Sequence, residues 1–139
     1  MKGGNWYFYV NHYRQNQKGM KKLRLIRDRS ECGEIDFVGE LVRESIQLSD
    51  LDQNQLGELT FAYKLGCGDS GASQAKLIIL ENGQKWIIRG QPRFEDHRMN
   101  LVEKGKRKVD PSFKKAPSVF LDFAKKHWDK HTPVIFTKD

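Results

Sequence analysis

The sequence predicts one α+β domain spanning residues 1–139, with a mostly antiparallel sheet of about five to six strands and two helices packed on one of its faces. The chain of 139 residues has room for a single domain. Six segments alternate apolar and polar side chains or form short apolar runs, as strands do. Two further segments repeat apolar side chains at helical spacing.

The first three strands are expected over residues 5–13, 21–29 and 34–42. In the first strand, aromatic residues such as Phe8 and Tyr9 fall on opposite faces, so both faces should be at least partly covered. The turn-forming stretch 15–19 joins the first two strands into a hairpin with one basic face.

The first helix is expected over residues 49–66. Ser49 is a favourable N-cap, and Asp50 and Asp52 suit the positive end of the helix dipole. Apolar side chains follow at helical spacing, and Gly66 is placed to end the helix.

The second helix is expected over residues 118–131, with His127 on its apolar face. His127 and His131 stand four residues apart and could share a metal ion. A core histidine and a helix-end histidine are the simpler interpretation, so no metal site and no cofactor is predicted.

A second hairpin is expected from residues 74–80 and 84–89, because the pair Asn82-Gly83 favours a type I' turn. A short edge strand is expected at 133–136, where Pro133 cannot donate to a ladder. Between them, residues 90–115 predict a long, irregular, basic connection with a helical turn near 97–103.

Composition indicates the compartment. No apolar run approaches the roughly 20 residues of a membrane span, and the first residues lack the features of a secretory signal. Cys32 and Cys67 form no CxxC pattern, so free thiols in a reducing compartment are expected, with a disulfide between them as the alternative. We therefore expect a cytoplasmic protein that contacts no membrane.

The formal charge of +7 is unevenly distributed along the chain. Residues 1–30 carry eight basic and one acidic side chains, whereas residues 31–60 carry one basic and eight acidic side chains. Residues 91–139 carry twelve basic and seven acidic side chains. This segregation predicts one acidic surface and at least one strongly basic surface.

The basic segments predict a small non-catalytic protein that binds DNA or RNA, or a complex that contains nucleic acid, by neutralising phosphates. Tyr7, Tyr9 and Tyr13 could stack on unpaired bases if their rings are exposed. The expected contacts lie on the second strand and the long connection: Arg14, Lys18, Lys21, Lys22, Arg24, Arg27, Arg29, Arg98, Lys104, Lys106, Arg107 and Lys108.

The acidic stretch favours an alternative. Its carboxylates would repel a polyanion, so the protein could instead be an accessory or inhibitor protein that docks onto a nucleic-acid-processing enzyme through its acidic and basic faces. The sequence leaves the oligomeric state open.

A glycine-rich stretch at residues 66–73 could cradle phosphates with its backbone N–H groups. The possible phosphate-binding set is Asp69, Ser70, Gly71, Lys76 and Arg89.

One region resembles the N-lobe loop and hairpin of HipA-type serine/threonine kinases. It consists of the loop sequence at residues 69–76, the strand 77–80, the turn at 82–83 and the segment Trp86-Ile87-Ile88-Arg89. The resemblance extends over residues 69–103, about a quarter of the chain. It implies that Arg89 replaces the lysine that contacts ATP phosphates and that Glu103 matches the acidic residue that orients it. The short remainder lacks the catalytic and metal-binding residues of a kinase, which leaves at most a nucleotide-binding remnant.

A metal-dependent nuclease is the other enzyme considered. Asp69 and Lys76 suit a strand-borne arrangement in which carboxylates hold Mg²⁺ and a lysine assists the attacking water. Gln74 stands where the second carboxylate would be needed, so catalysis is not the favoured prediction.

Overall fold

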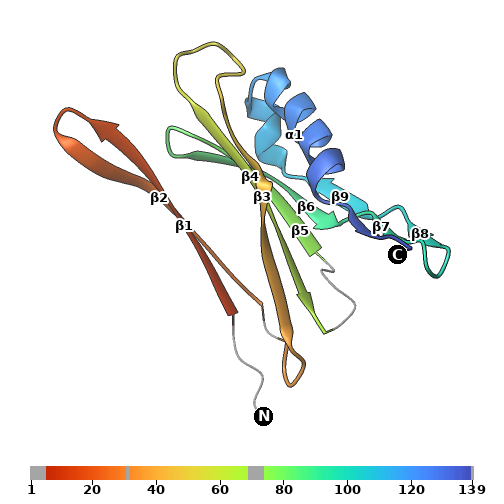
Figure 1. The fold of residues 1–139 in the computed structure, drawn as a ribbon. Coiled ribbons are helices and arrows are strands. Elements are labelled where there is room, and N and C mark those ends of the chain that lie inside the picture. Colours follow the sequence, from red (N-terminus) through yellow and green to blue (C-terminus); the bar gives the residue numbers. More distant parts are fainter. Residues whose placement is uncertain (1–5, 31, 69–73, 139) are drawn as a thin grey trace.

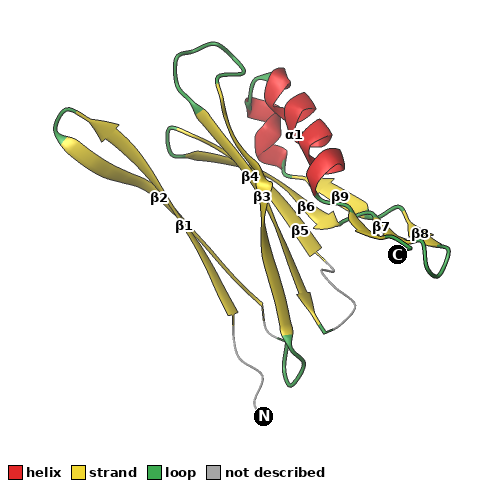
Figure 2. Cartoon of the chain, in the orientation of Figure 1, coloured by secondary structure: helices red, strands yellow, loops and turns green. Residues whose placement is uncertain are grey.

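The computed structural model describes residues 6–30, 32–68 and 74–138 (Figure 1). The described part consists mostly of strands, with a single α-helix (Figure 2). The elements in chain order are β1 (Trp6–Asn16), β2 (Gly19–Ser30), β3 (Phe37–Ser49), β4 (Glu58–Cys67), β5 (Gln74–Glu81), β6 (Gln84–Gln91), β7 (Phe94–Asp96), β8 (Leu101–Glu103), β9 (Lys106–Val109), the 3₁₀ helix η1 (Pro111–Lys115), α1 (Ser118–His131) and β10 (Val134–Phe136).

The strands form three sheets. β1 and β2 form a hairpin, and a five-stranded sheet has the order β3-β4-β5-β6-β9. A small sheet has the order β10-β7-β8, which confirms the edge position predicted for residues 133–136. All pairings are antiparallel except the parallel pair β10 and β7.

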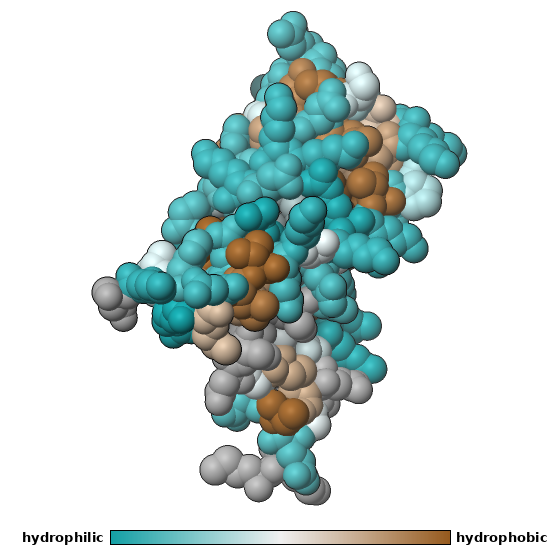
Figure 3. All heavy atoms as spheres, turned by 90° about the vertical axis from the view of Figure 1, so that its right-hand side faces the viewer, coloured by the Kyte–Doolittle hydropathy of each residue, from teal (hydrophilic) through white to brown (hydrophobic). Residues whose placement is uncertain are grey.

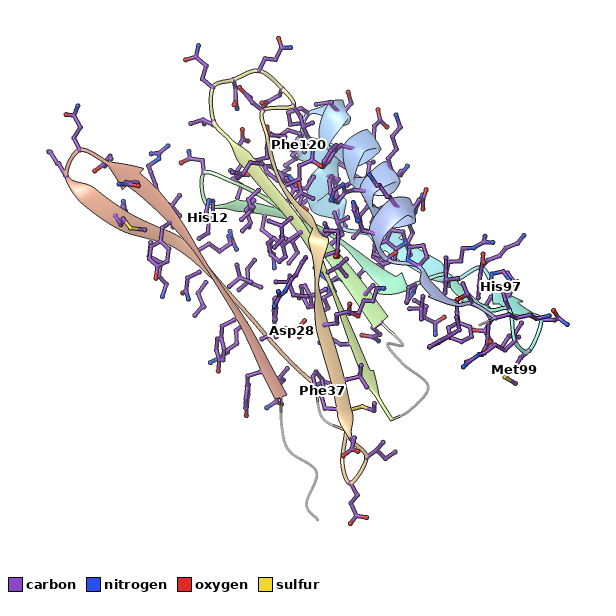
Figure 4. All side chains as sticks on the ribbon, viewed as in Figure 1. His12, Asp28, Phe37, His97, Met99 and Phe120 are labelled. Atoms are coloured by element: carbon purple, nitrogen blue, oxygen red, sulfur yellow. A yellow bond between two sulfur atoms is a disulfide. The ribbon has the colours of Figure 1, made fainter. Side chains whose placement is uncertain are left out.

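The molecule has three layers, because the hairpin covers one face of the five-stranded sheet and α1 covers the other (Figure 1). Along β5, Leu77 and Ile79 face the helix, whereas Ile78 and Leu80 face the hairpin, and all four are fully buried. Phe120 of α1 packs into the first of these cores (Figure 4). Strands buried on both faces carry continuous apolar runs, which is the pattern of residues 77–80.

The hairpin is attached to the sheet by both apolar and polar contacts. The ring of Phe8 stacks on that of Tyr63, with centroids 4.3 Å apart. At the other end of the hairpin, Arg24 Nε donates to the carbonyl oxygen of Gly83 at 2.6 Å. The Asn82-Gly83 turn itself has positive φ at both residues, so the predicted hairpin of β5 and β6 is confirmed.

The predicted α+β arrangement with two helices on one face is wrong, because the segment expected as a helix at 49–66 is a turn followed by β4. The side chains expected to cap the helix close the turn instead. Asp50 accepts hydrogen bonds from the backbone N–H groups of Asn54 and Gln55. Glu58 accepts from the hydroxyl of Ser49 and the backbone N–H of Leu51.

The apolar residues within 59–65 have the spacing of a helix face, although the segment is a strand. As a strand, the same stretch places Phe61 and Tyr63 against the hairpin and Ala62 against the helix layer. A central strand has apolar residues on both faces, so its sequence contains apolar pairs three and four apart that mimic a helix.

The predicted irregular connection at 90–115 is also wrong, since it contains β7, β8, β9 and η1. The stretch 97–100 is a turn between β7 and β8 rather than a helical turn. β7 gains its second partner from β10, about forty residues later in the chain, so local sequence could not indicate this strand.

Cys32 and Cys67 form a disulfide, which contradicts the expectation of free thiols. The bridge ties the segment before β3 to the end of β4. Disulfides are typical of oxidising compartments, so the argument from free thiols to the cytoplasm no longer holds. Among the described residues, no helix is both long enough and apolar enough to cross a bilayer.

We expect reduction of this disulfide to lower the free energy of unfolding by about 2–4 kcal/mol, because the closed loop spans 35 residues and its closure restricts the unfolded chain. Urea unfolding of the wild type with and without dithiothreitol measures this difference. The C32S/C67S variant is the control and should show the lower stability under both conditions. Equal stability of the oxidised and reduced wild type would contradict the prediction.

Candidate nucleic-acid interface

The basic part of the predicted connection forms β9, an edge strand of the five-stranded sheet. Lys106, Arg107 and Lys108 are exposed along this edge. Lysine-rich edges discourage pairing with other chains, and they leave charged groups open to solvent. The pairing requires Gly90 on β6, because a Cβ there would collide with the backbone of Lys106.

Two hollows flank β9. The larger, of about 510 Å³, lies toward α1 and is bordered by Trp128 and Asp129. The smaller, of about 390 Å³, is lined by residues of β6 and β9 and by Gln74 of β5. Among the described residues, six cationic side chains and one carboxylate, that of Asp129, line the two hollows together. We call the six cations the basic edge: Arg89, Arg93, Lys104, Lys106, Arg107 and Lys108.

The arginines of the basic edge are held in place, and the lysines are not. Arg107 donates to Asp129 Oδ1 at 2.7 Å, and Arg93 pairs with Glu95. The guanidinium of Arg89 lies 3.8 Å from the carboxylate of Asp110. In the described part of the chain, no carboxylate forms an ion pair with the three lysines, which leaves their ammonium groups available to an anion.

A row of cations leads from the basic edge toward the hairpin. Lys108, Arg89 and Lys76 are direct neighbours across β9, β6 and β5, and such neighbours share one face of the sheet. Lys76 bonds to Asp28 of the hairpin, which fixes the row on the hairpin side. We call these three residues the cationic row.

The pKa of Lys85 reflects its burial and the several cations that lie near it on the hairpin side of the sheet. Burial lowers the pKa of this lysine, and the positive charges of Arg24, Arg89 and Lys76 lower it further, against the opposing effect of Asp110. Side chains from β2, β5 and β6 therefore create a positive potential between the hairpin and the sheet edge.

Asp28 is the carboxylate that pairs with Lys76. It lies between the hairpin and the five-stranded sheet (Figure 4). It accepts hydrogen bonds from Lys76 Nζ and, at 2.9 Å, from the hydroxyl of Tyr63. Burial would raise the pKa of Asp28, but these two hydrogen bonds and the charge of Lys76 outweigh burial and lower it.

The predicted basic residues do not form one patch. Seven of them lie on the hairpin and its turn, and four lie at the basic edge, which is separated from the hairpin in Figure 1. Arg98 lies in the β7–β8 turn, where its hydrogen bonds lower the pKa of Asp96 to about 2. Its guanidinium also lies 4.8 Å from the ring centre of Phe136, so this residue has a structural role.

The acidic stretch occupies the opposite edge of the same sheet. Glu40 and Glu44 are exposed on β3, and Glu34 and Asp36 precede that strand. The sheet order places β3 and β9 at opposite ends, so the opposed charges of the sequence become opposed edges. The surface seen in Figure 3 is mostly hydrophilic, with small separate hydrophobic patches.

Part of the glycine-rich loop lies outside the described residues, including Asp69, Ser70 and Gly71. Of the possible phosphate-binding set, Lys76 and Arg89 are neighbours across two strands, and Lys76 is bonded to Asp28. Glu103 lies on β8, opposite Phe94. The phosphate loop, the kinase resemblance and the nuclease alternative stay predictions.

His127 is a core histidine, as the simpler interpretation predicted. It is buried, and its Nε2 lies 2.7 Å from the carbonyl oxygen of Ser45. The ring of His131 lies 4.3 Å from that of His127 at the helix end.

Arg93 is the residue of the basic edge that sequence reasoning missed, and Arg89 was assigned to a phosphate loop instead. Arg93 reaches the larger hollow because its carbonyl oxygen accepts from Val134 N, which anchors it beside the C-terminal strand. No local pattern in the sequence marks that contact.

Comparison with protein-family models, with curated proteins and with solved structures gives no match.

We expect Asp28→Asn to lower the free energy of unfolding at pH 7 by about 1–3 kcal/mol, because it removes a charged acceptor from Lys76 and Tyr63. The folded-state pKa of Asp28 is lowered, so its stabilisation is present above the unfolded value of about 4 and is lost as pH falls through the folded value. Denaturant unfolding between pH 7 and pH 2 should therefore show that the free energy of unfolding falls less in the variant than in the wild type as the pH is lowered. Asp36→Asn, at an exposed position, is the control; a D28N profile parallel to the wild type would disprove the role of this carboxylate.

Proposed function

We propose that the protein binds nucleic acid, DNA or RNA, through the basic edge. The observation that carries this proposal is the charge around β9, where six cations and one carboxylate of the described residues line two adjoining hollows. Cationic side chains that neutralise phosphates release condensed counterions, which drives binding without reading base sequence.

The arrangement of the edge suits a phosphate backbone. Successive residues of a strand point to opposite faces, so Arg107 is directed to the helix side and Lys108 to the hairpin side. Lys104 and Lys106 add flexible charges beside the larger hollow. Contacts of this kind position a nucleic acid and give little sequence preference.

The acidic stretch along β3 supports a second candidate function, that of an accessory protein that docks onto a nucleic-acid-processing enzyme. Exposed carboxylates such as Glu40 and Glu44 on β3 would complement a basic partner surface. In that case the basic edge would contact acidic groups of the partner rather than phosphates.

We expect Lys106→Gln with Lys108→Gln to weaken binding by about tenfold per lysine at 0.1 M salt, because each lysine contributes one phosphate contact. The slope of log Kd against log salt should fall in magnitude by about two. Fluorescence anisotropy with a labelled oligonucleotide measures both quantities.

The matched control is Lys114→Gln with Lys115→Gln, which removes two exposed charges from η1, outside both hollows. This control should keep most of the affinity. Equal losses in the two variants would indicate only an effect of net charge. Absence of binding by the wild type at 50 mM salt would refute the proposal and favour the accessory protein.

A further inference from the structure

The outer face of the hairpin exposes aromatic rings. Side chains of β1 alternate, so Phe8 and Val10 pack inward and Tyr7 and Tyr9 point outward. Tyr7 is 45% exposed and Tyr9 is 55% exposed, although both faces of this strand were expected to be covered. Within residues 6–30, 32–68 and 74–138, no packing contact accounts for two large exposed rings at these positions.

The two rings form a platform. Their centroids are 6.2 Å apart and their planes differ by 24°, so they present nearly parallel faces along the strand. Arg29 lies directly opposite Tyr7 on β2, and Arg27 lies opposite Tyr9. Aromatic rings beside guanidinium groups are the combination on which unpaired bases stack while the backbone meets positive charge.

A hollow of about 420 Å³ lies next to the platform, lined by Tyr7, Arg27, Asp28 and Arg29. Among the described residues that line it, Asp28 is the one carboxylate, and it accepts hydrogen bonds from Lys76 and Tyr63.

The platform and the cationic row lie on opposite faces of the hairpin. Asp28 points inward to Lys76, which is one end of the cationic row, and the other end of that row is Lys108 of the basic edge. The row therefore lies beneath the inner face of the hairpin, whereas the arginines opposite the rings share the outer face with them and supply the positive charge there.

We infer that Tyr7 and Tyr9, with Arg27 and Arg29 opposite them, form a base-stacking site for single-stranded nucleic acid on the outer face of the hairpin. The inference rests on the proposed function and specifies the form of its ligand. A duplex keeps the faces of its bases inside the helix, whereas a single strand exposes them. The platform should thus add affinity for a single strand only.

The test compares a labelled single-stranded oligonucleotide with a duplex of the same length, using the wild type, Y7A/Y9A and Y7F/Y9F. Loss of both rings should weaken binding of the single strand by about tenfold or more, since the stacking of each base on a ring contributes to the free energy of binding. Y7F/Y9F keeps the rings and should bind as the wild type does. Duplex binding should be unchanged in both variants.

Thermal unfolding of each variant checks the fold, and the exposed positions of both rings favour an unchanged midpoint. Wild-type affinity of Y7A/Y9A for the single strand would overturn the inference, as would an equal loss for the duplex. If K106Q/K108Q still weakens binding in those cases, the proposed function stands without the stacking site. If the wild type binds neither oligonucleotide, both proposals fall, and the exposed rings are better explained as a protein contact.

Discussion

The two central strands, β4 and β5, have both faces buried, and the rest of the molecule depends on that constraint. Leu77 and Ile79 on one face and Ile78 and Leu80 on the other are all fully buried. One face needs α1 and the other needs the hairpin, because a sheet with two apolar faces is stable only between two layers. The hairpin in turn needs the sheet, since two strands alone are marginal in water. Asp28 adds a polar link between these layers by accepting from Lys76 and Tyr63.

Because both faces of the sheet are covered, exposed charged side chains lie at its edges and on the outer face of the hairpin. The order β3-β4-β5-β6-β9 places the acidic stretch at one edge and the basic stretch at the other. The net charge of the chain would not reveal this separation. The cationic row extends positive charge from β9 to the inner side of the hairpin, and the exposed tyrosines lie with two arginines on its outer face. Both proposals for nucleic-acid binding follow from this distribution.

Local sequence predicted the elements whose stability is local. The turn at Asn82-Gly83 and the helix at 118–131 are confirmed, and both depend on residues close together in the chain. The helix expected at 49–66 was wrong because a strand buried on both faces also has apolar residues three and four apart. Arg93 was missed for a different reason, since a contact with the C-terminal strand places it in the site.

By itself, the sequence determined the two hairpins, the helix at 118–131 and the segregation of charge along the chain. These depend on side-chain alternation, turn residues and composition, which are properties of short segments. Only the tertiary structure decided that β3 and β9 are opposite edges, that Cys32 and Cys67 meet and that the predicted basic patch is divided. Strand order and long-range pairing depend on which apolar faces bury one another, and that choice involves the whole chain at once.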